Sequence, residues 1–168
     1  ASISSSKTAL SNLEKTGAMV SAYASQAVLN GDIAIEQSKK VDRTGIPLLN
    51  KGIMAFKTGI AGDPEASKFS LAVKTFADEY AKVVAGSSGG AVTTDSARNH
   101  MESLITESQT PEQFEEVIKL AKLEMSNRIQ ELKASAKDIK AEIRNIGENV
   151  LPGKPKAPQY KEGDTRVL

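Results

Sequence analysis

The sequence predicts an all-α protein, an elongated helical bundle or hairpin array around one long helix at about 111–146, with an extended C-terminal tail. Apolar residues recur at spacings of three and four, the period of a helix face. Hydrophobic residues make up 39% of the chain but aromatic residues only 4%, which favours narrow, Ala-lined helix seams over a wide core. Pro follows a capping side chain at two predicted helix starts.

Length and composition exclude several classes of protein. The 168 residues suit one domain of ordinary size. The chain has no Cys and one His, which excludes a disulfide scaffold, Cys-ligated metal and a His-rich metal site. The net charge of +1 shows no whole-chain preference for nucleic acid. No apolar run is long enough to span a membrane or to resemble a signal peptide.

The N-terminal region predicts a helix that begins near Ile3. Its apolar or small residues share one face, and the small ones, such as Gly17, would let a neighbouring helix approach closely. The pair Asn30-Gly31 predicts the end of this helix.

The segment that follows is less regular. Asp32 is placed to cap a short helix through Ile33 and Ile35, although the same residues suit an extended segment. Pro47 suits the first turn of a further helix, which we expect to end near Gly62.

A clear helix start stands at Asp63-Pro64-Glu65, with a capping side chain, a first-turn Pro and an acid at the positive end of the helix dipole. The Gly-rich loop at 86–90 ends this helix. We expect it to be the best-buried helix because its stripe holds half of the Phe residues: Phe69, Val73, Phe76, Tyr80 and Val83.

Two further helix starts follow. Thr93 or Thr94 caps a short helix whose apolar face consists of Ala97, Met101, Leu104 and Ile105. The run Thr110-Pro111-Glu112-Gln113 contains a cap, a first-turn Pro and the Gln of a capping box.

The longest helix starts at this capping box, and we expect Gly147 to end it. Its seam would extend about 50 Å. Such a seam is buried either against the shorter helices or against copies of the same chain, and both remain open. The seam consists of Phe114, Ile118, Ala121, Met125, Ile129, Leu132, Ala136, Ile139, Ile143 and Ile146.

Beyond Gly147 the composition changes, because three of the six Pro residues lie between 152 and 158. Such a composition is typical of an extended linker. We therefore divide the chain into a helical domain at 1–147 and a Pro/Lys-rich extended tail at 148–168.

No residue pattern indicates an enzyme, a cofactor or a metal site. We interpret His100 as a solvated residue of a helix. The loop at 86–90 lacks the Lys-Ser/Thr pair that completes a phosphate-binding loop. The acids of the long helix lie off its seam, and none belongs to the Glu-x-x-His motif of a di-metal bundle. We therefore interpret them as a solvated face, which consists of Glu112, Glu115, Glu116, Glu124 and Glu131.

Four basic residues flank the end of the seam: Lys133, Lys137, Lys140 and Arg144. One interpretation is contact with the phosphates of DNA or with an acidic membrane surface. The alternative is that cations favour the negative end of the helix dipole while Lys stems cover the edge of the seam. No aromatic residue is interleaved for base stacking.

Several short blocks carry a family resemblance. They are Gly62-Asp63-Pro64, Lys68-Phe69, Ala77–Val83, Thr94–Arg98, Thr110–Phe114 and Glu124–Arg128. Together they make the stretch 57–130 resemble a segment of uncharacterised virion proteins of tailed bacteriophages, of the internal or DNA-ejection type. The tail segment Tyr160–Thr165 is similar to a short C-terminal signature of such proteins.

The resemblance implies a non-enzymatic structural role inside a phage virion, with movement through or into a host envelope during genome delivery. It supplies no catalytic residues. The hypothesis is a homo-oligomer, with other virion proteins as further partners, which lines or plugs a DNA-exit channel. The alternative is a helical scaffold or protein-interaction domain that also contacts DNA through its basic residues.

Overall fold

The computed structural model describes residues 3–40, 64–108 and 110–150. Over these ranges the regular structure is helical, which confirms the predicted all-α class. The helices are α1 (Ile3–Ser38), α3 (Pro64–Ser87), α4 (Thr94–Glu107) and α5 (Pro111–Val150). The helix predicted after Pro47 and the tail from residue 151 onward lie outside the described residues.

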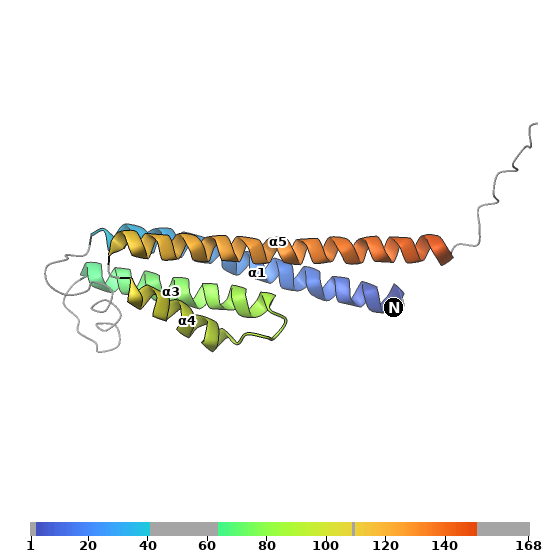
Figure 1. Ribbon diagram of the computed structural model, residues 1–168, viewed down its shortest axis with the longest axis horizontal. Coiled ribbons are helices and arrows are strands. Elements are labelled where there is room, and N and C mark those ends of the chain that lie inside the picture. Colours follow the sequence, from blue (N-terminus) through green and yellow to red (C-terminus); the bar gives the residue numbers. More distant parts are fainter. Residues whose placement is uncertain (1–2, 41–63, 109, 151–168) are drawn as a thin grey trace, which may run out of the picture.

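Two long helices form the length of the molecule. α1 and α5 lie side by side in opposite directions, and α3 and α4 pack along only one half of them (Figure 1). The other half is a two-helix extension, formed by the N-terminal part of α1 and the C-terminal part of α5 (Figure 1). The expected elongated bundle around the long helix is therefore confirmed.

α1 corrects the prediction that a helix ends at Asn30-Gly31. It runs unbroken to Ser38 and buries Gly31 against α3 and α5. A Cβ on Gly31 would lie 3.0 Å from Cγ2 of Ile118 and 3.1 Å from Cδ2 of Phe76. Glycine here permits close helix packing instead of a turn, and Asp32 extends the same helix rather than capping a new one.

α3 is the best-buried helix, as predicted. All five residues of its predicted stripe are 3% exposed or less. The Phe69 ring meets the Phe114 ring edge to face at a centroid distance of 5.5 Å, and the Phe76 and Tyr80 rings stack at 6.4 Å. Its central place follows from packing against α1, α4 and α5 at once.

The predicted caps of α4 and α5 are confirmed, whereas the cap expected at Asp63 lies outside the described residues. The Thr93 hydroxyl accepts a hydrogen bond from the backbone N–H of Ser96 at the start of α4. At the start of α5, the Gln113 N–H donates to the Thr110 hydroxyl at 3.2 Å, and the Thr110 N–H donates to the Gln113 side chain at 3.3 Å. This reciprocal pair satisfies two backbone donors that a helix start leaves without partners.

α5 is longer than predicted, because it continues through Gly147 to Val150. A glycine favours a helix end only where the chain turns, and here the helical conformation continues. Pro152 follows two residues after Val150, and the residue before a proline is disfavoured in the α region. The boundary expected at 147–148 is therefore not a boundary of secondary structure.

Candidate interaction surface

The predicted seam of α5 divides into two parts. Its first part lies in the intramolecular core, with Phe114 and Ile118 fully buried and Met125 1% exposed. Ile129 and Leu132 are partly buried at the edge of this core. The last part continues into the two-helix extension, where the half-buried side chains are Ile139, Ile143 and Ile146.

Ion pairs set the register between α1 and α5. Asp32 pairs with Lys122 at 2.5 Å, Glu14 with Lys140 at 2.8 Å and Lys39 with Glu115 at 3.3 Å. The two residue numbers of each pair have the same sum, as an antiparallel pair in one continuous register requires. The pairs therefore form a ladder along α1 and α5.

The ladder is interrupted by small residues. Its register places Ser21 level with Lys133 and Gly17 level with Lys137, so the α1 positions at these two levels hold small residues instead of acids. A Cβ on Gly17 would meet no other atom within 4 Å. The result is a groove between the two helices.

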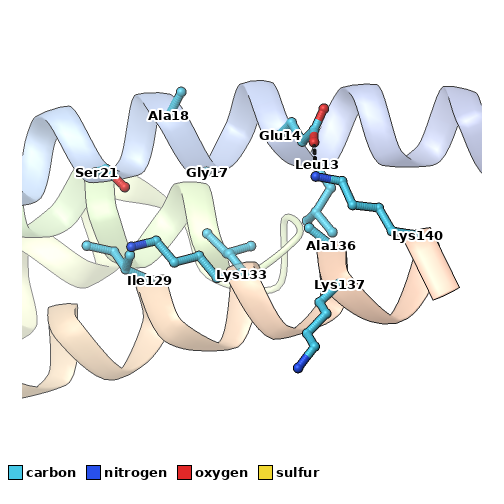
Figure 2. A pocket seen from close by; sticks show the side chains of 11 residues that line it. Leu13, Glu14, Gly17, Ala18, Ser21, Ile129, Lys133, Ala136, Lys137 and Lys140 are labelled. Carbon is cyan, nitrogen blue, oxygen red and sulfur yellow. Dashed lines mark ion pairs between the residues drawn. The ribbon is translucent and has the colours of Figure 1, made fainter.

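The groove has a volume of about 490 Å³ (Figure 2). Apolar side chains from both helices line it, and lysines of α5 stand along one edge. Figure 2 shows Lys140 reaching Glu14 across the groove, while Lys137 points away from α1. The α1 lining consists of Leu13, Glu14, Gly17, Ala18 and Ser21, and the α5 lining of Ile129, Leu132, Lys133, Ala136, Lys137 and Lys140.

The four basic residues singled out in the sequence have different surroundings. Lys133, Lys137 and Lys140 line the groove, whereas Arg144 lies beyond its lining. Lys140 is engaged by Glu14. Within the described ranges, no carboxylate lies at ion-pair distance from the other three. The groove thus combines an apolar floor with cations, which suits binding of an apolar, acidic group.

A polar cluster joins α3 to α5 and corrects the interpretation of Glu124 as part of a solvated face. The Tyr80 hydroxyl donates to Glu124 at 2.5 Å, and Arg128 donates two hydrogen bonds to the other carboxylate oxygen. Arg128 also reaches the Ser87 hydroxyl at 3.4 Å. The seam pattern missed this cluster because it records only apolar residues.

Burial and hydrogen bonding shift the pKa values of Glu124 and Tyr80 in this cluster. Burial raises the pKa of Glu124, but the hydrogen bonds from Tyr80 and Arg128 outweigh it and hold this pKa below its ordinary value. Burial, together with the hydrogen bond to Glu124, raises the pKa of Tyr80 well above its ordinary value. The carboxylate is thereby kept ionised and the phenol protonated, so the cluster holds two helices together.

Over the ranges that the structure describes, no three His, Asp or Glu side chains are grouped so as to hold a metal ion. None of the described helices is long and apolar enough to cross a membrane. His100 is exposed on α4, as predicted.

Comparison with known proteins gives no further guide. No family model, no curated protein and no solved structure matches this chain.

Sequence reasoning missed a second apolar feature of α5. Leu120 and Leu123 lie off the seam and are 64% and 57% exposed. Together with Glu116 and Asn127 they step by four, three and four, which is the period of one helix face. That period was the signal that could have revealed them.

Proposed function

We propose that the chain is a non-enzymatic structural protein of a phage virion, which works as a homo-oligomer assembled through its two-helix extension at the genome-ejection or tail and portal channel. The observation that carries this proposal is the groove between α1 and α5, with the seam that continues past α3. The resemblance to virion proteins supports a place in a phage particle, and the groove supports assembly into a homo-oligomer.

The two halves of α5 differ in how fully their seam is covered. In the first half, α1 and α3 both cover the seam, and its large side chains are fully buried. In the extension α1 alone packs against it, and three Ile side chains stay half-buried. Covering apolar surface yields about 25 cal/mol per Å². A further helix in this place would therefore stabilise the extension, which two helices alone bury incompletely.

The oligomeric state of the whole chain tests the assembly. Sedimentation velocity over a range of concentrations, up to tens of micromolar, should show a species larger than the monomer that grows with concentration. A strict monomer throughout this range would overturn the homo-oligomer.

The setting needs a separate test. Mass spectrometry of purified particles should detect the chain at a stoichiometry of several copies, and a density map of the particle should place helical density of this length at the channel. Absence from particles, together with partners found only in the host, would favour a scaffold or interaction domain instead.

A second candidate function is contact with DNA through the basic residues of α5. It is favoured by the three cations at 133, 137 and 144, which face no described carboxylate. Retention on immobilised DNA should then fall steeply with salt. Replacing Lys133, Lys137, Lys140 and Arg144 by Glu should abolish it. Unchanged retention in that variant would rule this function out.

A further inference from the structure

Charges are sorted by sign along the part of α5 that belongs to the two-helix extension. Between residues 133 and 144, every two charged side chains that stand three or four residues apart have the same sign, which disfavours the helix. In the first half of α5 the same spacing also joins opposite charges, as in the ion pairs of Lys119 with Glu115 and of Arg128 with Glu124. A partner that brings the opposite charge would compensate for the like-charged neighbours of the extension.

The cations form a basic row along the groove. They step by four, three and four residues, which keeps them on one side of α5, and three of them line the groove. On the α1 side, Lys7 stands seven residues before Glu14 and so adds a cation to the same side of the extension. Within the described ranges, Lys140 is the member of the row that has a carboxylate partner, Glu14. The basic row consists of Lys133, Lys137, Lys140 and Arg144.

The acids form a second row, on the side of α5 that contacts α3. Glu124 accepts a hydrogen bond from Tyr80 of α3, and two acids follow Glu124 by seven and fourteen residues, about two and four helical turns. α3 ends before this row begins, since its last residue, Ser87, is the one that Arg128 reaches. The acids of the row are exposed, and none has an ion-pair partner within the described ranges. The acidic row consists of Glu131, Asp138 and Glu142.

Uncovered isoleucines accompany the acidic row. Ile139 stands three residues before Glu142 and Ile146 four residues after it, so all three share one side of α5. Both isoleucines are only half-buried, because α3 does not extend far enough to cover them. The extension therefore has two different faces: a basic face, which holds the groove, and an acidic face, which holds Ile139 and Ile146.

One antiparallel register of two α5 helices matches the charges of these faces. The acidic face of one copy is laid on the basic face of another, and each acid then stands level with a cation. The pairs are Glu131 with Arg144, Asp138 with Lys137 and Glu142 with Lys133. Their residue numbers have the same sum, so a single register forms all three. Lys140, which Glu14 already engages, stands level with the neutral Ser135.

The same register matches the apolar residues. Ile146 stands level with Ile129 of the other copy, and Ile139 stands level with Ala136. Ile129 and Ala136 both line the groove, whose α1 wall has small residues that leave room for incoming side chains. Arg128, beside the end of α3, stands level with residue 147 of the other copy, so the overlap begins where α3 ends.

We propose that copies of this chain associate by seating the acidic face of one extension on the groove of the next, with their α5 helices antiparallel. The partner is thus a second copy, and the inference rests on the proposed homo-oligomer while specifying its interface. Because the two faces differ, each copy binds one neighbour through its acidic face and another through its basic face. Such an interface gives a ring if the rotation closes and an open chain if it does not.

Complementarity favours a second copy over a nucleic acid. A phosphate backbone matches the basic face, but it leaves the acidic row unpaired and the isoleucines uncovered. A second copy supplies opposite charge to both rows and covers Ile139 and Ile146 in the same step.

Reversing the charges in two variants tests the interface directly. The first variant carries Lys133→Glu with Lys137→Glu, and the second carries Asp138→Lys with Glu142→Lys. Each variant alone brings like charges together, so its dissociation constant for self-association, measured by sedimentation velocity, should rise by about tenfold or more. Mixed in equal amounts, the two variants should associate about as tightly as the wild type, because each unchanged face meets an unchanged face and each reversed face a reversed one.

A matched pair of single variants controls for net charge. Lys137→Glu and Lys15→Glu change the net charge equally, and both lysines are exposed. Lys15 lies on α1 outside the lining of the groove, so Lys15→Glu should leave association unchanged, whereas Lys137→Glu should weaken it. Equal weakening by both would overturn the pairing of the two rows.

The outcomes separate the possible interfaces. Association of the mixture, but of neither double variant alone, supports the proposal. If both double variants self-associate as tightly as the wild type, this interface is wrong while the homo-oligomer stands. If the wild type is itself monomeric, both are wrong. If only the first variant loses assembly, and nuclease treatment of the wild type has the same effect, nucleic acid bridges the copies and the proposal is overturned.

Filling the groove provides a second test. Because a Cβ at Gly17 meets no atom within 4 Å, Gly17→Leu should leave the monomer folded while its side chain occupies the space meant for the isoleucines. Self-association should be lost, with an unchanged far-ultraviolet circular dichroism spectrum. Ala22→Leu is the matched control, since Ala22 is exposed on α1 outside the groove lining and a leucine there should leave association intact. Retained association of the Gly17→Leu variant would overturn the seating in the groove.

Discussion

The two glycines of α1 should respond in opposite directions to the same substitution, Gly→Ala. Both lie inside a continuous helix, where Gly costs about 0.5–1 kcal/mol relative to Ala. At Gly17 no atom lies within 4 Å of the added Cβ. The whole helix-forming gain should therefore appear, and Gly17→Ala should raise the free energy of unfolding by about 0.5–1 kcal/mol.

At Gly31 the added methyl meets three side chains. The Cβ would lie 2.9 Å from Cε of Lys122, 3.0 Å from Cγ2 of Ile118 and 3.1 Å from Cδ2 of Phe76. Lys122 is held in an ion pair with Asp32, and Ile118 and Phe76 are fully buried, so a shift of any of the three disturbs an existing contact.

Overpacking a core costs about 1–3 kcal/mol, which exceeds the helix-forming gain. Gly31→Ala should therefore lower the free energy of unfolding by about 0.5–2 kcal/mol. Urea unfolding followed by circular dichroism, at a protein concentration low enough to keep the chain monomeric, measures both variants. If Gly31→Ala stabilised the chain as much as Gly17→Ala does, the close approach of α1, α3 and α5 at this residue would be refuted.

Three further predictions concern the polar cluster and the caps. Tyr80→Phe removes the hydrogen bond to Glu124 and should lower the free energy of unfolding by about 1–2 kcal/mol; an unchanged urea midpoint would contradict the bond. Because the pKa of Glu124 is lower in the folded state, its contribution is complete above the unfolded pKa and is lost as pH falls through the folded one. Glu124→Gln should therefore flatten the acid side of the stability–pH curve, and an equally steep curve would argue against the cluster. Thr110→Ala breaks the capping box with Gln113 and should cost about 1 kcal/mol in thermal unfolding, whereas a change at Thr106, outside the box, should cost less.

Much of the fold could be predicted from local patterns. The start of α5 is an example, because Thr110 and Gln113 are three residues apart and their reciprocal hydrogen bonds involve only each other. The stripe of α3 is another, since a helix with an apolar side must bury it against some neighbour. Such features depend on residues within one or two turns, so the sequence contains all the information they need.

The candidate site could be predicted only in part. The basic residues of α5 were recognised, but whether each has a partner depends on α1, which lies more than a hundred residues away in the chain. Lys140 meets Glu14, while Lys133 and Lys137 line the groove at the level of the small residues Ser21 and Gly17. The seam was recognised as well, but its division into a covered half and an uncovered half follows from the length of α3, not from the pattern of α5.

The sequence by itself therefore determined the helical class, the caps and the side that each helix buries, because these follow from the period of the helix and from nearby hydrogen bonds. Only the tertiary structure decided how Gly31 and Glu124 act. Gly31 lies between three helices and lets them approach, although Asn30-Gly31 is locally a stop signal. Glu124 is held by Tyr80 from another helix, although its own helix places it on a polar side. In both cases, contacts between distant parts of the chain outweigh the local preference.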